Sequence, residues 1–214
     1  MVLSVACLAG CGDRDGGGPV VFSEGDYALP GETLEDWVSY GDQLSVVSVL
    51  DATEPEPWPA YKHSGGLAGR QASVRIERTL WRRAEAPAAG RRLSFDVWGW
   101  MWDDDQDPGS DLRPVLEEGA PRMQPGRRYL ALLVRMRGEW GPISSRAVMT
   151  IAPDARVTSE APVGRPSPGA AALRGRTLAR AAAVVAATRP DPLAARFAAL
   201  PPRKRFAAVV RERG

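Results

Sequence analysis

The chain has 214 residues, of which 44% are hydrophobic and 25% charged, which suffices for one well-cored domain with appendages and leaves a two-domain enzyme cramped. Its 22 glycines and 19 prolines favour short strands and turns over long helices. The formal charge of +2 is uneven, because residues 164–214 hold eleven Lys and Arg against two acids, a net of +9 that leaves −7 for the rest, and this predicts an acidic body with a basic tail.

The N-terminal apolar run ends in Leu8-Ala9-Gly10-Cys11 and is followed by a polar, glycine-rich segment. This motif resembles the lipobox of bacterial lipoprotein signal peptides, in which small residues admit the signal peptidase and the cysteine thiol receives a diacylglycerol. The resemblance implies that residues 1–11 are a signal peptide with its lipobox, that Cys11 is lipidated, and that residues 12–31 form a flexible tether. It also implies a location at the extracytoplasmic face of the cell membrane.

The apolar run departs from a signal peptide in two respects: no Lys or Arg precedes it, and it is short for a signal peptide's hydrophobic region. We expect that the true start codon lies upstream and supplies the basic residues. The alternative is an ordinary apolar N-terminus with two chance cysteines. Either way, the run is far shorter than the roughly 20 residues of a transmembrane helix.

Cysteine and histidine are nearly absent from the body. No cysteine follows Cys11, and the single histidine, His63, stands in the proline-rich segment 54–66. Thiolate nucleophiles, disulfides and Cys/His zinc sites are therefore excluded there, and a Ser-His-Asp triad would depend on a loop histidine. There is no phosphate-binding glycine motif. We assign no catalytic residue and no cofactor, and we expect that the protein is not an enzyme.

A short helix is predicted over Thr33–Tyr40, with Thr33 and Asp36 in a capping-box spacing and Trp37 on its apolar face. Five strand patterns follow, separated by Gly- and Pro-rich turns. They cover Gln43–Leu50, Gln71–Trp81, Arg92–Trp102, Arg128–Arg137 and Ala147–Ile151. We therefore expect a mainly β protein with C-terminal helices (α+β), in which residues 32–152 form a small five-stranded, OB-like antiparallel barrel.

Four segments carry a second resemblance: Gln43–Leu50, Gly69–Trp81, Trp98–Trp100 and Pro125–Leu130. Their order is similar to that in uncharacterised secreted or lipid-anchored proteins of high-GC Gram-positive bacteria, and in outline to the netrin-like relatives of the OB fold. Netrin-like domains usually carry disulfides, which this body lacks. The resemblance implies a fold and no functional residue.

The third strand carries tryptophan at every second position. Alternation assigns Leu93, Phe95, Val97, Gly99 and Met101 to the barrel interior and Trp98, Trp100 and Trp102 to the outer face. We expect the Trp37 helix or the C-terminal helices to cover these rings. Two alternatives stay open: the rings form a ligand platform for sugar, peptidoglycan or protein, or a bulge at Gly99 turns Trp100 into the core.

The acids Asp103, Asp105 and Asp107 imitate the first half of a calcium-binding loop. The glycine and the bidentate glutamate that such a loop needs later are replaced by Pro108 and Pro114. The favoured interpretation is a solvated acidic loop from Asp103 to Arg122, with no metal.

The C-terminal part is predicted to consist of a linker over residues 153–169 and a basic helical tail over residues 170–214. Helices are expected over Leu173–Thr188, after the Asp191-Pro192 start signal, and over Arg203–Arg211, the last with Phe206, Val209 and Val210 together on a narrow apolar stripe. One interpretation is that these helices dock on the barrel. The other is that their basic residues contact anionic lipid or wall polymer. The candidate residues are Arg174, Arg176, Arg180, Arg196, Arg203, Lys204 and Arg205.

Together these patterns predict a lipid-anchored, extracytoplasmic binding or interaction module of the cell envelope, with an envelope protein or glycan as partner. A structural envelope protein without a ligand and a carboxylate hydrolase using acids such as Asp96 and Glu77 are the alternatives. Nucleic acid is not expected as a partner, because the folded body is acidic and the predicted location is outside the cell.

Overall fold

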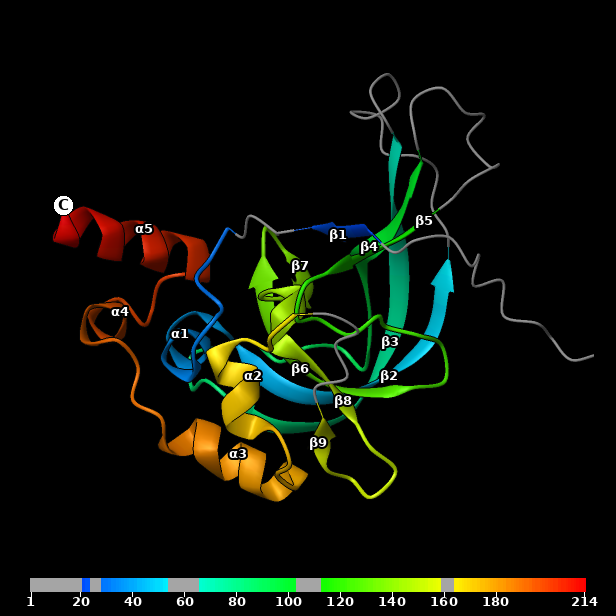
Figure 1. The fold of residues 1–214 in the computed structure, drawn as a ribbon. Coiled ribbons are helices and arrows are strands. Elements are labelled where there is room, and N and C mark those ends of the chain that lie inside the picture. Colours follow the sequence, from blue (N-terminus) through cyan, green and yellow to red (C-terminus); the bar gives the residue numbers. More distant parts are fainter. Residues whose placement is uncertain (1–20, 24–27, 54–65, 103–112, 159–163) are drawn as a thin grey trace, which may run out of the picture.

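The computed structural model describes residues 21–23, 28–53, 66–102, 113–158 and 164–214 (Figure 1). Its centre is one curled sheet with strand order β1-β5-β4-β3-β2-β6-β8-β9, and β7 pairs with β6 as a branch. The helices gather on one side of the curl (Figure 1). Neighbouring strands run antiparallel, except for the parallel pair β1 and β5.

The strands are β1 Val21–Ser23, β2 Gln43–Thr53, β3 Gly66–Arg82, β4 Arg92–Trp102, β5 Arg113–Glu117, β6 Arg128–Met136, β7 Glu139–Pro142, β8 Val148–Ile151 and β9 Val157–Thr158. The helices are α1 Leu34–Tyr40, α2 Pro168–Leu173, α3 Leu178–Ala187, α4 Pro192–Arg196 and α5 Pro202–Arg213, with the 3₁₀ turn η2 Ser145–Ala147 before β8.

Strand β2 is the centre of the sheet, because it pairs with β3 on one side and β6 on the other. Its run of β-branched residues suits a strand buried on both faces. Leu44 and Val46 point into one hydrophobic cluster, whereas Val47 and Val49 point into a second one on the opposite face. The sheet therefore has two cores, one beneath the helices and one inside the curl.

The helices share the first core with the sheet. Helix α1 begins with the predicted capping box, in which the Asp36 backbone N–H donates to Thr33 Oγ1 at 3.0 Å and the Thr33 backbone N–H donates to Asp36 Oδ2 at 2.9 Å. The Trp37 ring is fully buried and donates from Nε1 to the Gly31 carbonyl at 2.8 Å. Six buried residues from the C-terminal helices belong to the same cluster: Ala170, Leu173, Ala181, Val185, Ala194 and Val209. The described part of residues 164–214 is therefore packed against the sheet.

The expectation of a mainly β protein with C-terminal helices is confirmed, and each of the five predicted strands is present. The strand number of five is wrong, because nine strands join the sheet among the described residues. The additional strands have only 3, 5, 4 and 2 residues, too few to show alternation in the sequence. The expected helix Leu173–Thr188 is instead two helices, separated at Gly175, whose φ of 75° lies in the left-handed region.

Candidate functional site

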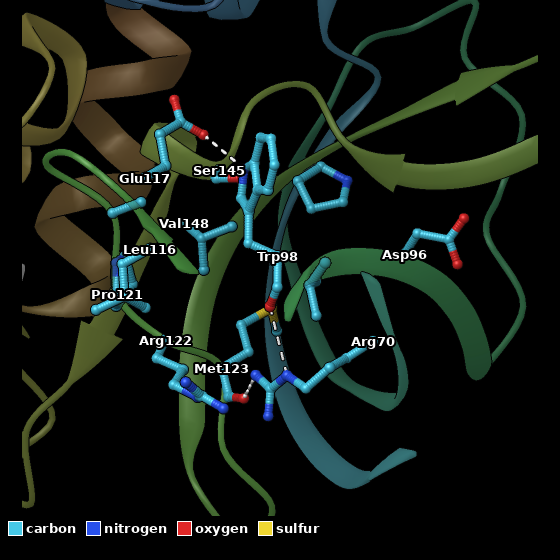
Figure 2. A pocket seen from close by; sticks show the side chains of 13 residues that line it. Arg70, Asp96, Trp98, Leu116, Glu117, Pro121, Arg122, Met123, Ser145 and Val148 are labelled. Atoms are coloured by element: carbon cyan, nitrogen blue, oxygen red, sulfur yellow. Dashed lines mark hydrogen bonds between the residues drawn. The ribbon is translucent and has the colours of Figure 1, made fainter. Parts of the chain in front are cut away.

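A cavity of about 200 Å³ lies beside Trp98. Its walls come from β3, β4, β5, the turn after β5, the end of β7, η2 and the start of β8 (Figure 2). Leu116, Met123 and Val148 supply apolar surface, while Arg70 and Glu117 supply buried polar groups. We call this space the Trp98 cavity.

A β-bulge at Gly99 determines how the tryptophans of β4 are presented. Trp98 pairs with Gly69, and Trp100 pairs with the adjacent Ala68. Strand β4 therefore has one extra residue, Gly99, between two consecutive pairs with β3. An extra residue turns the following side chains to the other face. Trp100 is accordingly only 7% exposed, whereas Trp98 is half-buried and lines the cavity. The two rings do not continue one face.

The expected covering by helices is wrong for the two described rings of this row, Trp98 and Trp100. Trp37 and the C-terminal helices belong to the other core. The Trp100 ring lies instead beneath the guanidinium of Arg122, whose Cζ is 4.3 Å from the ring centroid, a cation–π distance. Trp98 donates from Nε1 to Glu117 Oε2 at 3.3 Å. The segment 114–123 therefore covers both rings, and it includes residues that the sequence had assigned to a solvated loop.

Glu117 is a buried acid with a shifted proton equilibrium. Glu117 is the last residue of β5, and it is 3% exposed. Burial raises the pKa of this carboxyl to about 7, against the opposing effects of a hydrogen bond from Ser145 and the charge of Arg146. Near neutral pH the carboxyl is present in both forms, so it can accept or donate a hydrogen bond to a ligand.

Arg70 fixes a positive charge in the same wall. It is 6% exposed, and its Nη2 donates to the Met123 carbonyl at 2.7 Å while its Nε donates to the Trp98 carbonyl at 3.4 Å. These bonds connect β3, β4 and the turn after β5. The guanidinium is therefore held in place by two backbone carbonyls.

Several predicted site residues lie outside the described part of the chain. These are Cys11, His63, Asp103, Asp105 and Asp107, together with the side chain of Trp102. The described residues contain no group of three or more His, Cys, Asp and Glu side chains that could hold a metal ion. In the same described part, no helix is long and apolar enough to cross a membrane.

Most of the predicted basic tail residues are at the surface, since Arg174, Arg180, Arg196, Arg203 and Lys204 are exposed and Arg176 is half-buried. Arg205 is the exception and corrects the prediction, because it is only 1% exposed. Its guanidinium donates to the carbonyls of Ser39, Ala198 and Leu200.

Helix α5 begins at Pro202, so its buried side chains are Pro202, Arg205 and Val209. Val210, which was expected in the stripe, is 51% exposed. The position of Arg205 therefore follows from where the helix starts and how it is rotated against the core.

The sequence did not point to the most important residues of the cavity. Glu117 and Arg70 carry no motif, and Met123 and Ser145 stand in turns. The only signal was the short run Pro114-Val115-Leu116, which indicates a strand segment once the preceding acids are set aside.

Comparison with known proteins places the chain in no described group: no family model, no curated protein and no solved structure matches it.

Proposed function

We propose that this protein is a lipid-anchored, extracytoplasmic binding module of the cell envelope, and that it holds part of a small ligand in the Trp98 cavity. The observation that supports this proposal is the meeting of a half-buried indole, a buried carboxyl and a buried guanidinium around one cavity (Figure 2). Apolar walls with a few fixed polar groups are typical of ligand sites.

The size of the cavity restricts the ligand. Its volume of about 200 Å³ is below the ~300–1,000 Å³ usual for sites that enclose a drug-sized molecule. The cavity would therefore take one sugar ring or one side chain of a longer glycan or peptide. The indole of Trp98 offers a stacking surface, and Glu117 and Arg70 offer hydrogen bonds to hydroxyl, amide or carboxylate groups.

Binding is tested by tryptophan fluorescence and calorimetry with soluble cell-wall fragments: disaccharides, muropeptides and stem peptides. We expect one fragment class to bind the wild type, and Trp98→Phe to weaken that binding at least about tenfold, the equivalent of ~1.4 kcal/mol. The matched control is Trp81→Phe, because this half-buried tryptophan packs against the other core. Equal affinity in both variants would place the site elsewhere, and no response to any fragment would favour a structural envelope protein without a ligand.

The lipid anchor needs a separate test, because Cys11 is the single residue on which it depends. Mass spectrometry of the membrane-extracted protein is expected to show a diacylglyceryl group on an N-terminal cysteine at position 11. Cys11→Ala should release the protein from the membrane fraction, whereas Cys7→Ala should not. An intact N-terminus ahead of Cys11 in the membrane fraction would exclude the proposed processing.

A carboxylate hydrolase is the second candidate, favoured by one observation. Asp96 and Glu117 line the same cavity, on either side of Trp98 (Figure 2), and the raised pKa of Glu117 suits a general acid. Glu117→Gln separates the two functions, since a hydrolase loses turnover of the bound fragment while a binding module merely changes its affinity. Unchanged fragments after prolonged incubation with the wild type would exclude hydrolysis.

We also propose that the curled sheet is an OB-like barrel with added short strands. The antiparallel order β4-β3-β2-β6 supports this topology. Gly141 of β7 lies against Phe95 of β4, with a distance of 3.7 Å between an ideal Gly141 Cβ and the Phe95 Cβ, where such a barrel would close. Nuclear Overhauser contacts between the backbones of β4 and β7 are expected, and their absence would leave an open half-barrel.

A further inference from the structure

A second hollow, with no lining residue in common with the Trp98 cavity, lies between the turn from β6 to β7, the end of β3 and the start of α5. Its volume is about 570 Å³. The described cations that line it are Arg83, Arg135, Arg137, Arg203 and Lys204. We call this hollow the basic cleft.

The acids of the basic cleft are already engaged. Asp42 is 1% exposed and accepts a hydrogen bond from Arg83 Nη2 at 2.8 Å and another from the Arg135 backbone N–H at 2.8 Å. Glu85 accepts from Arg83 Nη1 at 3.1 Å. Five cations against these two carboxylates leave the lining with a net charge of +3. Positive charges gathered in a concave site favour the entry of an anion.

A buried arginine behind the wall increases this positive field. Arg205 donates from Nη2 to the Ala198 carbonyl at 3.1 Å, and Arg83 donates from Nη1 to the same carbonyl oxygen at 2.9 Å. Two guanidinium groups therefore meet at one acceptor. Burial and, second to it, the charge of Arg83 together lower the pKa of Arg205 to about 10, against the opposing charge of Asp42. The Nε–H groups of both arginines are buried and have no hydrogen-bond partner among the described residues.

Arg137 stands at a position that does not suit arginine. It forms a two-residue turn with Gly138, and their φ angles are 53° and 94°. Such turns require φ > 0 at both residues, and Asn, Asp or Gly are preferred there because other side chains are strained. A charged side chain kept at a strained backbone position is typical of a functional contact.

We propose that the basic cleft binds a phosphate group of a discrete phosphorylated ligand, coordinated by Arg137, Arg203 and Lys204 at the rim and by the field of Arg83 at the base. Phosphate fits because it carries more than one negative charge, and because guanidinium groups donate to its oxygens in pairs. The cleft is also large enough for a ligand extending beyond one phosphate. This proposal depends neither on the Trp98 cavity nor on the lipid anchor.

The decisive experiment compares two variants that remove the same charge from the tail of the full-length protein. Arg203→Gln with Lys204→Gln removes two exposed cations inside the cleft, whereas Arg174→Gln with Arg180→Gln removes two exposed cations outside it. Pyrophosphate binding is measured by calorimetry. Binding to phosphatidylglycerol vesicles, against phosphatidylcholine vesicles, is measured by sedimentation. Circular dichroism verifies that each variant is folded.

We expect pyrophosphate to bind the wild type with one-to-one stoichiometry, and the cleft variant to bind about tenfold more weakly, while the outside variant changes less than about twofold. Selective loss of vesicle binding by the cleft variant, with no pyrophosphate binding, would identify a lipid headgroup as the source of the phosphate. Equal losses in both variants would show diffuse attraction to the basic tail and overturn the proposal. Absence of binding to both probes would overturn it too.

Discussion

The buried carboxyl of Glu117 allows a stability measurement that tests the environment of the Trp98 cavity directly. Its pKa rises from 4.5 to about 7 on folding because the group is buried. The folded state therefore holds this proton more tightly than the unfolded state. The stabilisation is fully present below about pH 4.5 and is lost as the pH rises through 7. Wild-type protein should consequently lose stability over this range through Glu117.

The magnitude follows from the size of the shift. One pKa unit corresponds to about 1.36 kcal/mol, so the full shift corresponds to roughly 3 kcal/mol. Between pH 5 and pH 8 the greater part of this change occurs, which gives an expected loss of about 2 kcal/mol in the free energy of unfolding. Glutamine cannot titrate, so Glu117→Gln should lack this component and gain stability over the wild type as the pH rises.

The assay is urea unfolding followed by circular dichroism at several pH values between 5 and 8. The quantity compared is the difference in unfolding free energy between wild type and Glu117→Gln at each pH. Glu139→Gln, at an exposed strand end, controls for the removal of one carboxyl from the chain. A difference for Glu117→Gln that stays constant with pH would refute the reasoning, because it would mean that burial does not hold the proton on Glu117.

Three further outcomes test packing and backbone geometry. Leu173→Ala, at a fully buried position of α2, should lower the free energy of unfolding by about 2–5 kcal/mol within one cooperative urea transition. Leu200→Ala is the control, because Leu200 is 36% exposed, and it should lower this free energy far less. A separate early transition would show that the tail unfolds alone. Gly169→Ala places a Cβ 2.9 Å from a buried indole carbon and should lower the melting temperature through a loss of about 1–3 kcal/mol, while Gly90→Ala, whose Cβ meets nothing closer than 3.6 Å, should not. Arg137→Asn should raise stability by about 0.5–1 kcal/mol by relieving the left-handed strain, and a loss of stability would show that the arginine is a structural contact.

Local patterns predicted the elements whose cause is local. The capping box of Thr33 and Asp36 forms as its spacing indicates, because the two residues satisfy the backbone donors of their own first turn. Asp191 likewise begins α4, accepting from the Leu193 and Ala194 backbone N–H groups. These bonds span at most four residues, so no distant part of the fold is needed to form them.

The candidate site could be predicted only in part. Alternation correctly placed a strand over Arg92–Trp102 and singled out Trp98. It could not predict that Gly99 would bulge, because a bulge depends on the register with β3. Glu117 has the same limitation, since its pKa is raised by burial in the folded protein, and the groups that oppose this rise, Ser145 and Arg146, are distant in the chain.

The amino-acid pattern alone was enough for the class of fold, the start signals of α1 and α4 and the five longer strands, because period and capping are properties of neighbouring residues. Packing between distant segments determined the rest. It buried Arg205 among backbone carbonyls, covered Trp100 with Arg122, and brought Arg137 of a hairpin close to Arg203 of a helix. These contacts depend on register, helix rotation and chain reversal, and each of the three is set by the assembled core.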